Sequence, residues 1–112
     1  MGFDRLWLPD HILYPSDRPS YDAWTLMSGL ATRTSRIGFG PGVTDVHRRH
    51  PVVVAQQLAT LDRMSHGRVV LGLGSGEAMN LEPFGVPWKE RKVGKVREFV
   101  SVVNGLLNQE GA

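Results

Sequence analysis

The sequence predicts an α/β fold in which parallel strands alternate with helices. Apolar runs of strand type begin about every 32 residues, and each is followed by a segment with helical spacing of apolar residues. This order requires parallel pairing with right-handed crossovers. The spacing matches a (β/α)8 TIM barrel, in which roughly 250 residues form eight units, although open doubly wound sheets use similar units. Residues 1–112 are expected to form one domain of three βα units, which is part of a barrel.

The first unit consists of an apolar strand, Arg5–Leu8, and a helix over about residues 21–32. Ser20 and Asp22 precede the helix, and either side chain is a suitable N-cap. The apolar positions of the helix share one face: Trp24, Met27, Leu30 and Ala31.

The second unit begins with the strand Ile37–Gly40 and continues with a helix that starts at Pro51. Proline is favoured in the first turn of a helix, because a backbone N–H there would have no hydrogen-bond acceptor within the helix. Gly67 suits the position just past the helix end. The apolar face is formed by Val54, Leu58, Leu61 and Met64.

The third unit combines the strand Val69–Leu73 with a helix over about residues 91–107, which Gly94 and Gly105 weaken slightly. The strand is apolar throughout, which is typical of a strand buried on both faces of a parallel sheet. The apolar stripe of the helix contains Val93, Val96, Phe99, Val100, Val103, Leu106 and Leu107.

Charge and composition exclude several classes of protein. Thirteen basic against eleven acidic residues leave a net charge of +2, and no basic stripe interleaves with aromatics, so nucleic-acid binding is not expected. The charged runs His47–His50 and Lys89–Arg97 are interpreted as solvated faces, or otherwise as a rim that faces an anion. The chain has no cysteine, which excludes disulfides and thiolate chemistry. Membrane-spanning and signal segments are not predicted, so a cytoplasmic protein is expected.

Polar residues follow each predicted strand. Asp10 and His11 come after the first, the segment Gly40–Asp45 after the second and Gly74–Glu77 after the third. Since carboxyl ends of parallel strands meet at one rim, these residues are expected to converge on one site.

Each cluster has a chemical and a structural interpretation. Asp10 and His11 suit proton transfer, or a loop in which the aspartate caps a turn. Glu77 is a candidate acid–base group or the cap of the next helix. The glycines around Pro41 indicate a bulge or an unusual peptide geometry that exposes backbone, or a plain tight turn. His47 and His50 have a spacing that permits metal binding, but their arginine neighbours favour a helix-start role instead, and no metal site is predicted.

These motifs resemble the bacterial luciferase-like superfamily of flavin- and deazaflavin-dependent oxidoreductases. Its coenzyme F420 branch, which includes methylenetetrahydromethanopterin reductase and the phthiodiolone ketoreductases, is the most similar. The matching stretches are Gly2–His11, Gly42–Asp45 with Arg49–Pro51, Ala59–Asp62 and Gly67–Glu77.

The resemblance implies a TIM barrel of which this chain forms the second to fourth βα units. It also implies hydride transfer between coenzyme F420 and an organic substrate, with His11 as general base and Glu77 as acid or proton relay. Gly42–Val43, or alternatively Pro41–Gly42, would be a non-prolyl cis peptide behind the ring. The residues that it places at the cofactor are Asp10, Gly42, Val43, Thr44, Ser75, Gly76 and Asn80.

Two alternatives to this function are retained. The same fold could use FMN as a monooxygenase, or the chain could be an inactive, truncated structural or dimerisation module. The partners expected are a small-molecule substrate and either a second copy of the chain or the missing half of the barrel. Isolated, the chain is expected to self-associate or to be partly disordered, because it would expose sheet edges and apolar faces.

Overall fold

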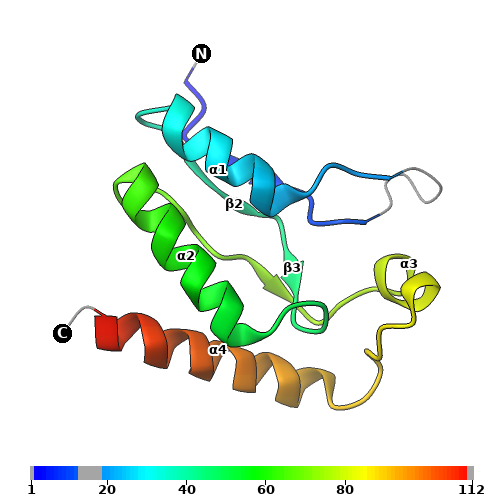
Figure 1. Cartoon of the computed structure of the whole chain (residues 1–112). Coiled ribbons are helices and arrows are strands. Elements are labelled where there is room, and N and C mark those ends of the chain that lie inside the picture. The colour runs from blue at the N-terminus through cyan, green and yellow to red at the C-terminus, as the bar shows by residue number, and fades with distance from the viewer. Residues whose placement is uncertain (1, 13–18, 111–112) are drawn as a thin grey trace.

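Parallel strands form one layer of the molecule, and helices cover one face of it (Figure 1). The structure is a computed structural model that describes residues 2–12 and 19–110. The molecule is a slab of 37 × 36 × 19 Å, as expected for one sheet and one layer of helices. The strands are β1 (Arg5–Leu8), β2 (Gly38–Pro41), β3 (Thr44–Asp45) and β4 (Leu73–Gly74), and the pairs β1–β2 and β3–β4 are both parallel. The α/β class with parallel strands is confirmed.

The helices follow the predicted order. They are α1 (Ala23–Arg33), α2 (Pro51–Ser65), the short α3 (Ala78–Leu81) with the 3-10 turn η1 (Glu82–Phe84), and α4 (Lys92–Glu110). Helix α1 lies beside α2, which also packs against α4 (Figure 1). The first helix begins at residue 23 rather than 21, and the last extends to residue 110 rather than 107.

Side chains at the helix starts explain two of these boundaries. The Asp22 carboxylate accepts a hydrogen bond from the backbone N–H of Thr25 at 2.8 Å, so α1 begins only after residue 22. Pro51 occupies the first position of α2, and Nδ1 of His50 accepts from the N–H of Val52 at 3.2 Å. Of the two predicted caps, Asp22 rather than Ser20 is the one used, and the Pro51 start and the helix-start role of His50 are confirmed.

The end of α2 ties the helix layer to the strands. Gly67 follows the helix with a left-handed φ of 85°, as predicted. The next residue, Arg68, reaches back to the carboxyl end of α1, where its guanidinium donates to the carbonyl oxygens of Ala31, Thr34 and Ile37. The bonds to Ala31 and Thr34 satisfy carbonyl groups that the end of α1 leaves unpaired, and the bond to Ile37 reaches the residue before β2.

The predicted strand Val69–Leu73 is paired only at its two ends, so the expectation of a continuous strand is wrong. Residue 69 bridges Phe39, and residue 73 begins β4. Phe39 donates to the carbonyl of Arg68 and accepts from the N–H of residue 70. Pro41 is the next donor position along this ladder, and it has no N–H to donate. The ladder therefore stops at the proline.

Pairing resumes beyond Pro41 with a changed register. The difference in residue number between paired positions is 30 at the Phe39–Val69 bridge but 29 at the pair Thr44–Leu73. One extra residue is therefore accommodated in the segment Gly42–Val43, which agrees with the bulge interpretation of these glycines.

The core lies between the strands and the helices. Met27 of α1, Phe39 of β2 and Val54 of α2 are fully buried there. Most of the predicted helix faces are confirmed: the other buried core side chains include Trp24, Ala31, Leu58, Leu61, Phe99 and Val103. The exceptions lie on α4, where the predicted face includes three exposed side chains: Val93 (71% exposed), Val100 (38%) and Leu106 (37%).

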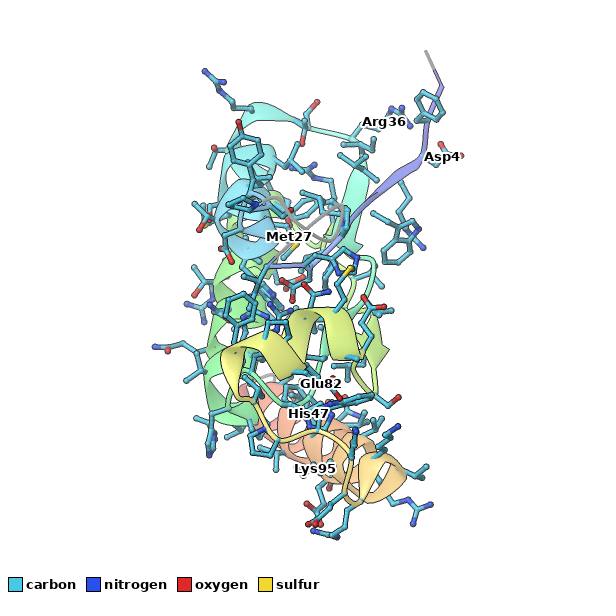
Figure 2. The ribbon with its side chains drawn as sticks, turned by 90° about the vertical axis from the view of Figure 1, so that its right-hand side faces the viewer. Asp4, Met27, Arg36, His47, Glu82 and Lys95 are labelled. Atoms are coloured by element: carbon cyan, nitrogen blue, oxygen red, sulfur yellow. The ribbon has the colours of Figure 1, made fainter. Side chains whose placement is uncertain are left out.

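The other face of the strands carries no helix in the described part of the chain (Figure 2). Trp7 lies there across Gly40 and Gly42, and it is 47% exposed. Val43 and Val70 are exposed as well. Self-association through such apolar surface stays a prediction.

Candidate functional site

The three polar clusters predicted from the sequence converge on one cleft at the carboxyl ends of the strands. The cleft has a volume of about 340 Å³ and is lined by Asp10, His11, Gly42, Val43, Asp45, Gly74, Ser75, Gly76, Glu77 and Asn80. A groove of about 450 Å³ lies between α2 and α4, but its described lining is mainly aliphatic and offers no acid–base pair. The cleft at the carboxyl ends of the strands is therefore the candidate site.

Three of its side chains, His11, Glu77 and Asn80, form what we call the open cluster. Nδ1 of His11 lies 3.1 Å from Oε1 of Glu77 and 2.5 Å from Nδ2 of Asn80. The same amide nitrogen donates to Oε1 of Glu77 at 3.2 Å. Glu77 occupies the N-cap position of α3, as the cap interpretation expects, but its side chain is 55% exposed and makes no capping bond.

The hydrogen bonds of Asn80 fix the orientation of its own side-chain amide. Its Oδ1 accepts the backbone N–H of Ile12 at 2.7 Å, so its NH₂ group must face His11 and Glu77. Neutral His11 accepts from this NH₂ group at Nδ1, whereas protonated His11 donates from Nδ1 to the Glu77 carboxylate. The cluster therefore offers a partner to either protonation state of His11, which suits a group that holds and releases a proton.

Behind the open cluster lies a buried ion-pair cluster formed by Asp10, Thr44, Asp45, Arg48 and Arg49. Arg49 binds both carboxylate oxygens of Asp10, at 2.6 and 3.2 Å, and Thr44 donates its hydroxyl to the same carboxylate. Arg48 donates to the Asp10 carbonyl at 2.6 Å and to Asp45 at 2.5 Å. The Asp10 side chain is only 2% exposed. This cluster joins the loop after β1 to the end of β3.

The environment of Asp45 favours its ionised form. Burial by itself raises the pKa of this carboxyl, but hydrogen bonds from the Arg48 side chain and from the backbone N–H groups of Arg48 and His47 outweigh it. The pKa of Asp45 therefore lies below its usual value.

The interpretation of the run His47–His50 as a solvated face is wrong. The side chains of Arg48 and Arg49 are only 11% and 18% exposed and face carboxylates of this chain. Asp10 lies almost forty residues earlier, so a local charge pattern gives no sign of it. The run Lys89–Arg97 fits the solvated interpretation better, since Lys89 and Arg91 are well exposed.

The remaining predicted cofactor residues lie in and behind the cleft. Gly42, Val43, Ser75 and Gly76 are part of its wall. Thr44 is fully buried, and its hydroxyl contacts only Asp10 and Arg49 among the described side chains. Contact of these residues with a cofactor stays a prediction.

Two kinds of feature are absent from the described part of the chain. No group of three or more histidine, aspartate or glutamate side chains in that part of the chain is placed to hold a metal ion. Likewise, none of the helices there is long and apolar enough to cross a membrane.

Comparison with known proteins identifies the family. The chain matches the luciferase-like monooxygenase family over residues 1–112. It belongs to this family. Among its relatives, the phthiodiolone/phenolphthiodiolone dimycocerosates ketoreductase of Mycobacterium kansasii is 35% identical over 130 aligned residues, which cover 98% of this chain. The F420-dependent glucose-6-phosphate dehydrogenase of Amycolatopsis mediterranei is 38% identical over 116 aligned residues, again covering 98% of the chain.

Solved structures of this family are similar as well. An F420-dependent secondary alcohol dehydrogenase, in complex with an F420–acetone adduct, has a TM-score of 0.82 and 33% identity over 92% of this chain. The chain covers 33% of that structure and 35% of each of the two curated relatives, so it spans about a third of their length.

Proposed function

We propose that this chain contributes the second to fourth βα units of a TIM barrel that binds coenzyme F420 and acts as an oxidoreductase. The observation that carries the proposal is the convergence of His11, Glu77 and Asn80 on one cleft, in a chain 33–38% identical to F420-dependent relatives. The names of these relatives support an alcohol–carbonyl pair as the organic substrate.

The cleft fits a flat ring system of this kind. Its walls include Gly42, Gly74 and Gly76, and an added Cβ at residue 74 would come within 2.9 Å of Val43. Backbone without side chains lets a planar ligand approach closely. The side chains at the cleft supply an imidazole, a carboxylate and an amide, which suit the polar edge of a deazaflavin.

Coenzyme F420, when bound, supplies hydride transfer to or from the substrate. The residues of this chain would transfer the accompanying proton. His11 takes or releases it at Nδ1, where Glu77 stabilises the charged ring and Asn80 the neutral one. The apolar face formed by Trp7, Val43 and Val70 would be covered by the remaining units of the barrel, which would exclude water from the site.

Titration of the purified chain with coenzyme F420 and, separately, with FMN tests the proposal through the fluorescence of each cofactor. We expect saturable binding of F420 that Asn80→Ala weakens about tenfold, since one or two hydrogen bonds are lost. Glu98→Gln is the matched control: residue 98 is an exposed glutamate that pairs with Arg91 on α4, and its substitution should leave binding unchanged.

Other outcomes would separate the alternatives. A preference for FMN would favour the flavin monooxygenase. Binding of neither cofactor by a folded chain would contradict the proposal and favour a structural or dimerisation module.

A further inference from the structure

The side chain of His47 reaches the loop that carries Glu77. Its Nε2 lies 2.6 Å from the carbonyl oxygen of Ser75. Because a carbonyl oxygen only accepts hydrogen bonds, Nε2 must carry a proton. In the neutral ring, Nδ1 is then the unprotonated nitrogen.

Packing alone does not explain an imidazole at this position. Nδ1 of His47 is buried and has no hydrogen-bond partner among the described residues. A buried polar atom without a partner destabilises the fold, so an apolar side chain would fill the same space more favourably. The feature that the imidazole adds is the bond from Nε2 to Ser75.

This bond extends the pairing of β3 with β4 beyond the last backbone pair. The ladder ends where Asp45 pairs with Gly74. Oδ1 of Asp45 accepts the backbone N–H of His47 at 2.8 Å, which anchors residue 47 to the end of β3. The imidazole then holds Ser75, the first residue after β4. A side-chain hydrogen bond therefore continues the contact between the two segments beyond the end of the backbone ladder.

The loop after β4 needs such a contact because glycines leave it free to move. Gly74 and Gly76 flank Ser75, and Gly76 has a φ of 99°, a conformation that other residues rarely adopt. A Cβ at residue 76 would lie 2.9 Å from Cδ2 of His47, so the ring packs directly against this glycine. Glu77 follows at once, with no capping bond of its own to α3.

We propose that His47 is a positioning residue that holds the Ser75–Glu77 loop and thereby keeps the Glu77 carboxylate beside His11. The proposal deepens the proposed function, and it rests on that function only for the claim that Glu77 acts on bound ligand. The state of the loop can be measured without any cofactor.

Nuclear magnetic resonance of the full chain and of two variants tests the proposal. His47→Gln keeps an N–H donor at the same number of bonds from Cβ as Nε2, whereas the amide of His47→Asn is one bond too short. In the wild type, ¹⁵N shifts should show the Nε2–H tautomer of His47. The backbone order parameters of Gly76 and Glu77 should be about 0.85 in the wild type and the Gln variant, and fall below about 0.6 in the Asn variant.

Affinity for coenzyme F420 is the second measurement. It should fall about three- to tenfold in His47→Asn and be restored to within about twofold by His47→Gln, as expected for the loss and return of one hydrogen bond. An Nδ1–H tautomer, or an Asn variant with the order parameters of the wild type, would overturn the role of His47. If the loop responds as expected but no variant binds F420, the positioning role stands and the proposed function fails.

Discussion

Two polar clusters share the rim of the cleft and differ in how deeply they are buried. In the ion-pair cluster, the Asp10 side chain is 2% exposed and lies against two arginines. In the open cluster, the Glu77 side chain is 55% exposed beside His11. Buried charges are costly to leave unpaired, whereas exposed ones are compensated by water. The comparison indicates that the first cluster holds the rim together, whereas Glu77 of the second cluster remains accessible to solvent.

The largest effect should come from breaking the ion-pair cluster. Arg48→Met leaves the carboxylates of Asp10 and Asp45 without one of their partners, which should lower the free energy of unfolding by about 3–5 kcal/mol. Urea denaturation measures it. The control Arg91→Met removes an exposed ion pair and should cost less than about 1 kcal/mol. Equal effects of the two substitutions would mean that burial does not distinguish these arginines.

A smaller effect that depends on pH should come from Asp45. Its pKa is depressed in the folded state, so its contribution to stability is fully present above the unfolded pKa of about 3.9 and is lost as pH falls through the folded pKa. Asp45→Asn should therefore cost about 1.5–3 kcal/mol near pH 6. The difference between the thermal midpoints of the wild type and of Asp45→Asn should begin to shrink below about pH 4 and disappear below the folded pKa. A gap that persists in acid would show that the charge of Asp45 is not what stabilises the fold.

The smallest effect on stability should come from Glu77, the exposed member of the open cluster. Glu77→Gln replaces an exposed carboxylate by an amide of the same shape, so the free energy of unfolding should change by less than about 0.5 kcal/mol. The same urea series measures it. Destabilisation comparable to that of Arg48→Met would contradict the division between the two clusters.

Much of the candidate site was predictable because strand ends in a parallel sheet share a rim. That rule alone placed His11 and Glu77 in one cleft, although they lie 66 positions apart in the chain, and the structure brings them within 3.1 Å. The positions of Arg48 and Arg49 could not be predicted in this way. Their partner Asp10 belongs to another βα unit, and a run of charged residues is typical of a solvated surface.

The sequence by itself determined the order of the three βα units, their parallel pairing and the start of α2 at Pro51, and it restricted the cap of α1 to Ser20 or Asp22. These features depend on local periodicity and on side chains within a few residues of the backbone groups that they satisfy. Only the tertiary structure decided where the ladder stops, because the missing N–H of Pro41 matters only opposite its partner strand. It also decided the partners of Asp10 and the bond from His47 to Ser75, since these contacts join segments that are distant in the chain and adjacent only after folding.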